Sequence, residues 1–180
     1  MFKKALQTVT LKRLHKRYRN PGRNVLVNTF NTAKSAAILW YPEDDGAMES
    51  YEHMRKVLTE HGISTRGLAL VDSADEKETF SKASHSRFFT GKEIDWKGNP
   101  KSDDLKSFTD TQFDLLLDLS ISELIPLQSI LVNSAASFKV GWKEPENNFY
   151  DLTVEISGKK NCRYLTEQII HYLEYINRKG

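Results

Sequence analysis

Short apolar runs alternate with amphipathic stretches along most of the chain. Three of the runs are continuous enough to predict buried strands: residues 35–41 (SAAILWY), 63–71 and 113–119 (FDLLLDL). Runs of this kind are typical of central strands in a parallel sheet, where both faces are covered. Residues 137–141 and 149–156 predict two further strands, and the alternation in the second favours a place near the sheet edge.

Helical spacing of apolar residues fills the segments between these strands. Residues 2–19 predict a helix that ends at Asn20-Pro21-Gly22. We expect Asp44 or Asp45 to cap a second helix, which ends near Gly62. Ser120 and Glu123 have the spacing of a capping box, so they predict the start of a buried helix. Three ranges complete the predicted helices: 103–108, 124–132 and 160–178.

Two segments give weaker signals. Residues 25–27 fit either a short strand or an extended connection. Residues 72–100 are polar and contain Gly91, Gly98 and Pro100, so they predict a long excursion. Within that excursion we expect one short apolar element near residues 87–90 and an exposed aromatic side chain at Trp96.

The order of these elements predicts an α/β fold: a doubly wound, mostly parallel sheet with helices on both faces, plus a basic N-terminal helix. We expect a helical arm over residues 1–23 and a single Rossmann-like α/β domain over residues 24–180. Ligands of such folds bind beyond the carboxyl ends of the strands, where the strand order reverses. The predicted crevice is lined by the loops after residues 40, 118 and 141.

Acidic and hydroxyl side chains follow the predicted strands at this crevice. The candidate ligands are Glu43, Asp44, Asp45, Asp118 and Ser120. Converging carboxylates can hold Mg²⁺ or move a proton, which would suit a small-molecule or metal-dependent enzyme. We favour the alternative that these carboxylates cap a helix or accept hydrogen bonds from loop amides.

Other catalytic and cofactor signals are weak. No glycine-rich turn follows the first strong strand, and three carboxylates there would repel phosphate, so we expect no nucleotide cofactor. The five histidines lack metal-ligand spacing, and we expect no metal or other cofactor. Cys162 is the single cysteine; we expect a plain semi-buried thiol, although the start of a helix could lower its pKa. A lone cysteine also fits a cytoplasmic location.

Charge is distributed unevenly along the chain. Nine basic residues precede the first acidic one, Glu43; the other 17 basic residues face 24 acidic ones, so residues 43–180 carry a formal charge of −7. Five of the nine lie on one predicted face of the first helix and are the candidate nucleic-acid contacts: Lys12, Arg13, Lys16, Arg17 and Arg19. A basic arm of this kind is an argument about partners, not about fold.

Three interpretations of the arm stay open. It can contact RNA or the ribosome, lie on an anionic membrane surface, or dock on its own acidic body. Membrane binding is less favoured because the apolar residues of the helix fall on two opposite sides. No apolar run is long enough to span a bilayer. From these signals we favour a binding or assembly factor that contacts RNA over an enzyme that uses the acidic crevice; a protein partner is an open alternative.

Several motifs resemble those of an uncharacterised family of small bacterial α/β proteins. Residues 113–120 look like its FDLLIDL-type strand, residues 135–141 like its SKAKFKVG-type strand, and residues 33–40 like its AKSIGILF-type first strand. Gly98-Asn99-Pro100-Lys101 and residues 150–154 match two further motifs. The same pattern is similar, more weakly, to the N-terminal half of heptosyltransferase-like enzymes. This chain lacks their second half and their Gly-Asp turn, so the resemblance implies a fold and no catalytic residues.

Overall fold

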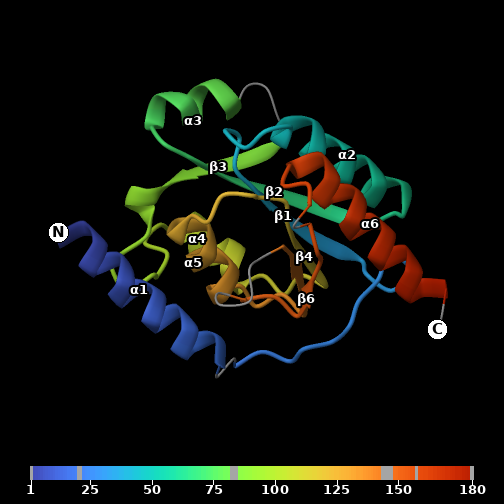
Figure 1. The fold of residues 1–180 in the computed structure, drawn as a ribbon, viewed down its shortest axis with the longest axis horizontal. Helices are drawn as coiled ribbons and strands as arrows, with labels where there is room; N and C mark the ends of the chain where they lie inside the picture. The colour runs from blue at the N-terminus through green and yellow to red at the C-terminus, as the bar shows by residue number, and fades with distance from the viewer. Residues whose placement is uncertain (1, 20–21, 82–84, 143–147, 157, 179–180) are drawn as a thin grey trace.

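A six-stranded, all-parallel sheet forms the centre of the computed structural model, which describes residues 2–19, 22–81, 85–142, 148–156 and 158–178 (Figure 1). The strand order is β3-β2-β1-β4-β5-β6. The strands are β1 (Ser35–Trp40), β2 (Ser64–Val71), β3 (Ser86–Thr90), β4 (Leu115–Asp118), β5 (Phe138–Gly141) and β6 (Leu152–Thr153). The predicted doubly wound α/β fold is therefore confirmed.

Helices cover both faces of the sheet (Figure 1). One face carries α2 (Ala47–Glu60), α3 (Ala74–Ser81) and α6 (Cys162–Arg178); the other carries α4 (Asp103–Asp110) and α5 (Ile125–Asn133). The N-terminal helix α1 (Phe2–Arg19) packs on α5, and a short 3-10 helix, η1, spans Gly91–Glu93. No helix in the described part of the chain is long and apolar enough to cross a membrane.

The central strand β1 shows why the apolar runs are continuous. Ile38 and Trp40 belong to the core beneath α2 and α6, whereas Ala37 and Leu39 belong to the core beneath α4 and α5. All four side chains are fully buried. A strand that serves two cores has no solvent-facing positions, so its sequence cannot alternate between polar and apolar residues.

The strand order reverses between β1 and β4. From β1 the chain passes to β2 and then β3 on one side of the sheet, whereas β4, β5 and β6 lie on the other side. The loops that follow β1 and β4 therefore meet at the carboxyl ends of two neighbouring strands, which is where the sequence placed the crevice.

Some predicted elements differ from the structure. The short apolar element expected near residues 87–90 is the edge strand β3, and the excursion also contains a complete helix, α3, which was not predicted. The segment 149–156 contributes only Leu152–Thr153 to the sheet, at the predicted edge. Residues 25–27 are an extended connection, one of the two alternatives, in which the Leu26 N–H donates to the Ser137 carbonyl at 3.1 Å. These elements are short or lie at an edge, where periodicity carries little signal.

Two predicted helix caps are wrong. The N-cap of α2 is Gly46, at a φ of 72°, and neither Asp44 nor Asp45 occupies that position. The left-handed backbone at Gly46 suits glycine because it has no Cβ. Helix α5 begins at Ile125 after Leu124, so the capping box expected from Ser120 and Glu123 does not form at its start. Pro126 lies in the first turn of α5, where a proline is tolerated.

Candidate functional site

Asp44 joins the loop after β1 to the loop after β4. One carboxylate oxygen accepts hydrogen bonds from the Ile121 N–H at 2.7 Å and the Ser122 N–H at 3.2 Å. The other accepts from the Ser122 hydroxyl at 2.5 Å. The side chain is buried. Asp44 therefore satisfies loop amides at the strand-order reversal, in keeping with the favoured sequence interpretation.

Both carboxylate oxygens of Asp118, at the end of the neighbouring strand β4, also accept hydrogen bonds. One oxygen accepts from the Ser120 N–H at 2.9 Å and the Ser120 hydroxyl at 2.6 Å, and the other accepts from the Tyr150 hydroxyl at 2.8 Å. Burial raises the pKa of the Tyr150 phenol well above its ordinary value, and the charge of Asp118 raises it further. This phenol therefore stays protonated and serves as a buried donor.

The crevice around these groups leaves little space. The cavity beside Asp118, Ser120 and Tyr150 measures about 10 Å³, which is the space of roughly one water molecule. Glu43 and Asp45, the other two candidates, are exposed. Among the described residues, no three His, Cys, Asp or Glu side chains are grouped closely enough to hold a metal ion. The geometry brings Asp44, Asp118 and Ser120 together as a linkage between loops.

A larger hollow of about 730 Å³ lies elsewhere, along the start of β2 and β3 and the side of α4. Its lining carries charges of both signs. Lys77 pairs with Glu93 at 3.3 Å, and Arg87 pairs with Asp104 at 3.4 Å. Because charges of both signs lie in its walls, this hollow presents no clear preference for an anionic or a cationic ligand.

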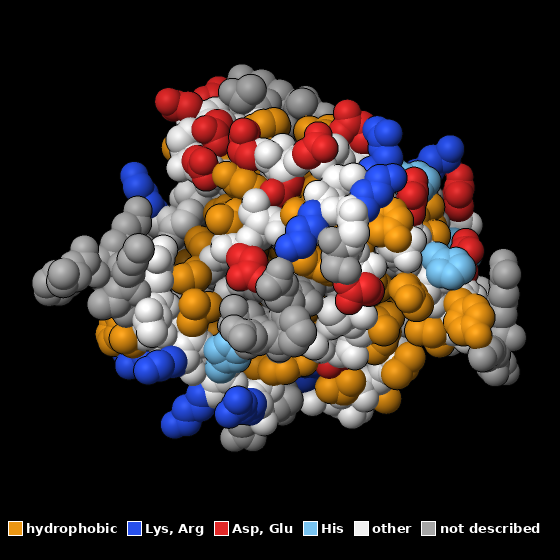
Figure 2. All heavy atoms as spheres, in the orientation of Figure 1, with side chains coloured by type: hydrophobic (Ala, Val, Ile, Leu, Met, Phe, Trp, Pro, Cys, Tyr) orange, Lys and Arg blue, Asp and Glu red, His pale blue; other side chains and the backbone are white. Residues whose placement is uncertain are grey.

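A continuous basic surface runs along α1. Lys12, Arg13, Lys16 and Arg19 are all exposed. Lys12, Lys16 and Arg19, together with His15, line a shallow depression of about 450 Å³. Figure 2 shows Lys and Arg side chains along the lower left of the molecule, over α1, with no acidic side chain among them. We call the four exposed cations of α1 the basic surface.

The opposite side of α1 is docked on the body. Leu14 is fully buried in the core beneath α4 and α5. Thr10 is also buried, and its hydroxyl donates to the Trp96 carbonyl at 2.8 Å. The Arg17 guanidinium donates to the side-chain oxygens of Asn133, at 2.5 Å, and Asn99, at 2.8 Å. Docking, one of the three interpretations, therefore uses Arg17 and leaves the other four candidate cations exposed.

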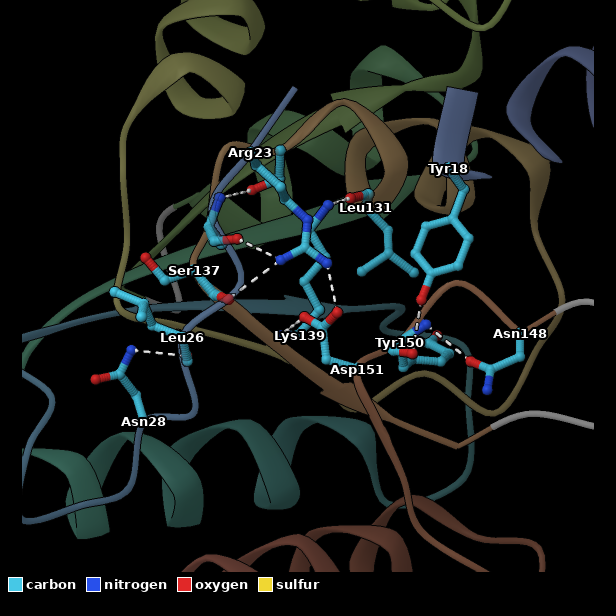
Figure 3. A network of polar contacts seen from close by, with 12 residues as sticks. Tyr18, Arg23, Leu26, Asn28, Leu131, Ser137, Lys139, Asn148, Tyr150 and Asp151 are labelled. Carbon is cyan, nitrogen blue, oxygen red and sulfur yellow. Dashed lines mark hydrogen bonds and ion pairs between the residues drawn. The ribbon is translucent and has the colours of Figure 1, made fainter. Parts of the chain in front are cut away.

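A second set of contacts fixes the end of α1 and the chain that follows it (Figure 3). The Tyr18 hydroxyl donates to the Tyr150 carbonyl at 2.8 Å. Arg23 is almost buried; it pairs with Asp151 at 2.5 Å and also donates to the carbonyls of Ala136 and Ser137. Together with the contacts of Thr10, Leu14 and Arg17, these contacts hold the second half of α1 against the body.

Lys139 lies beside this network (Figure 3). Its side chain is 1% exposed, and its ammonium donates to the Leu131 carbonyl, in the last turn of α5, at 2.6 Å. Burial lowers the pKa of Lys139 to about 7; the nearby charge of Arg23 lowers it as well, and Asp151 acts in the opposite direction. A lysine inside the otherwise apolar run Phe138–Gly141 is the sequence signal that could have identified this group.

Cys162 begins α6, as predicted, and is fully buried. Burial raises the pKa of its thiol to about 12, and the charges of Asp44, Asp118 and Asp45 raise it further, in that order. The influence of a helix start is therefore outweighed. The thiol remains protonated at neutral pH and is not a nucleophile there.

The comparisons with known proteins agree with the resemblance read from the sequence, in that the chain falls in an uncharacterised family. No curated protein matches it. The model of a family of unknown function, DUF6913, matches residues 4–176. That match takes in α1 from residue 4 onward and every strand of the sheet. The chain belongs to the DUF6913 family.

Proposed function

We propose that this protein binds RNA through the basic surface of α1, by contacts to backbone phosphates. The supporting observation is the exposure of Lys12, Arg13, Lys16 and Arg19 on a helix whose other side is docked. Lys12, Lys16 and Arg19 are spaced four and three residues apart, so they project from neighbouring turns of one helix face. Successive phosphates of a nucleic-acid strand present a matching row of negative charges.

The docking of α1 on the body favours binding. A disordered basic arm must be ordered when it binds, and that ordering costs conformational entropy. Here Leu14, Arg17 and Arg23 already fix the helix. Rigidifying a binding element in its bound conformation strengthens binding, because fewer degrees of freedom are lost.

The docking also separates this proposal from membrane binding. A helix that lies flat in a membrane turns its apolar side toward the lipid. In α1 the fully buried apolar residue, Leu14, faces the body. Of the side chains described from residue 7 onward, the exposed ones are polar or charged apart from Val9, at 41% exposed. A polar, cationic outer face fits a hydrated phosphate backbone better than an acyl layer.

The experiment is a titration of fluorescently labelled RNA followed by anisotropy. The test variant replaces the basic surface with glutamine (Lys12→Gln, Arg13→Gln, Lys16→Gln, Arg19→Gln). The matched control changes the net charge equally at four exposed lysines on other elements or loops (Lys34→Gln, Lys56→Gln, Lys106→Gln, Lys159→Gln). Because each phosphate contact adds to affinity, we expect the test variant to lose at least about tenfold in affinity at low salt and the control to lose little.

Two results would overturn this proposal. One is equal affinity of the wild type and the test variant, since the basic surface would then contribute nothing. The other is binding to vesicles of anionic lipid without binding to RNA, which would assign the surface to a membrane. Circular dichroism of each variant checks that the fold is retained, as expected for exposed side chains.

A further inference from the structure

Trp96 is the exposed member of the three tryptophans. Trp40 is 0% exposed and Trp142 8%, whereas Trp96 is 49% exposed. It lies in the turn between η1 and α4, as the sequence predicted for an exposed aromatic. An exposed indole next to a strongly charged surface is a feature of proteins that stack aromatic rings on nucleic-acid bases.

The turn that carries Trp96 is held in one shape. One Asp95 carboxylate oxygen accepts from the N–H groups of Lys97 and Asn99, both at 2.8 Å, and the other accepts from the Asn99 side chain at 3.0 Å. The pKa of Asp95 is lowered: burial opposes this shift, but these hydrogen bonds and the charge of Lys97 outweigh it. Gly98 completes the turn at a φ of 79°.

Contacts to α1 place the indole beside the basic surface. The Trp96 carbonyl accepts from the buried Thr10 hydroxyl at 2.8 Å. The Arg13 guanidinium carbon lies 4.7 Å from the Trp96 ring centroid, and the Lys97 ammonium lies 5.3 Å from it. Both cations are exposed. The ring is therefore bordered by one cation of the basic surface and by a further cation from its own turn.

We infer that Trp96 stacks on an unpaired base, so that the ligand of this surface is single-stranded RNA. This inference rests on the proposed function. In the free protein, Arg13 and Lys97 lie over the ring in exposed cation–π contacts, which are weak enough to be exchanged. When a base stacks on the indole, these two cations turn to the adjoining phosphates. Bases inside a duplex already stack on one another, so a duplex offers the surface its phosphates only.

The test compares three polyanions: a single-stranded oligouridine, an RNA hairpin that is mostly duplex, and inorganic polyphosphate. The key variant is Trp96→Leu, and Trp96→Phe is the matched variant that keeps an aromatic ring. We expect Trp96→Leu to lose about tenfold in affinity for oligouridine and to change little on the hairpin or polyphosphate. Trp96→Phe is expected to recover much of the loss. Oligouridine is also expected to quench the fluorescence of the wild type, which polyphosphate does not.

A purely structural role for Trp96 gives a different pattern. If the indole only anchors α1 through Arg13, Trp96→Leu lowers the affinity for all three polyanions equally, and the inference is overturned. Equal affinity of wild type and Trp96→Leu for oligouridine overturns it as well. In both cases the proposed function still holds if replacing the basic surface with glutamine lowers the affinity for RNA. No binding of wild type to any of the RNAs overturns the proposed function itself.

Discussion

The buried Lys139 predicts an unusual dependence of stability on pH. Its pKa is lowered from an ordinary 10.5 to about 7 by burial and by Arg23. At pH values between about 7 and 10.5, Lys139 is mostly protonated in the unfolded chain and mostly neutral in the folded protein. Stability must therefore rise as the pH rises through this window, and below about pH 7 the penalty for a buried charge is present in full.

The size of the effect follows from the shift. With a folded pKa of about 7 and an unfolded pKa of 10.5, the free energy of unfolding gains about 1.5 kcal/mol from this group between about pH 7 and about pH 8.5. We restrict the comparison to pH below about 9 because the raised pKa of Cys162 has the opposite effect on stability. Above the pKa of the thiol in the unfolded chain, Cys162 lowers the free energy of unfolding as the pH rises.

Urea unfolding at several pH values in this range provides the assay. The perturbation is Lys139→Met, which removes the titrating group and keeps most of the volume; Lys34→Met, at an exposed lysine, is the matched control. We expect the wild type and the control to gain stability with pH and Lys139→Met to gain about 1.5 kcal/mol less over the same range. If the free energies of unfolding of wild type and Lys139→Met change in parallel with pH, the reasoning is refuted, whatever the constant difference in stability between them.

Three further outcomes are expected. Leu14→Ala removes a buried contact of α1 and should lower the free energy of unfolding, measured in urea, by about 3 kcal/mol. Val9→Ala, at a more exposed site, should lower it by about 0.5 kcal/mol or less, and an equal loss of stability in both variants contradicts the docking of α1. Asp44→Ala removes the acceptor of three donors, so it should lower the free energy of unfolding by about 2 kcal/mol; RNA affinity should stay unchanged. Asp45→Ala is the control at an exposed position, and an equal loss of stability in both variants contradicts the role assigned to Asp44. Cys162 should resist a thiol reagent in the native protein and react once urea unfolds it; rapid labelling of the native protein contradicts its burial and raised pKa.

The parts of the fold that were predictable are those with a strong local signal, such as a continuous apolar run. β1 and β4 serve two cores, so their sequences are continuously apolar and unmistakable. β3 pairs on one side only and begins with Ser86 and the exposed Arg87, so it resembles the polar excursion around it. Its role as a strand depends on Phe88 and Phe89 reaching separate cores, which only the tertiary structure reveals.

The site was predictable in composition and not in arrangement. Charge counting identified the cations of α1, but not that Arg17 would bind two asparagine side chains from distant loops and helices. The carboxylates of Asp44 and Asp118 were expected at the strand-order reversal with loop amides as partners, and both accept from loop amides. The sequence did not indicate that the amides for Asp44 would come from the loop after β4, or that Tyr150 would donate to Asp118. These partners are far apart in sequence, and no local pattern encodes such contacts.

The most direct test of the central claim is the salt dependence of RNA binding. Because each phosphate contact releases counterions, the logarithm of the association constant falls with the logarithm of salt concentration by about 0.7 per contact on a single strand. The four exposed cations on α1 and the adjoining Lys97 therefore predict a slope of about −3.5 for the wild type. The variant of the basic surface keeps Lys97 of this set, so its slope should be about −0.7. A wild-type slope near zero, or an unchanged slope in that variant, would contradict the account.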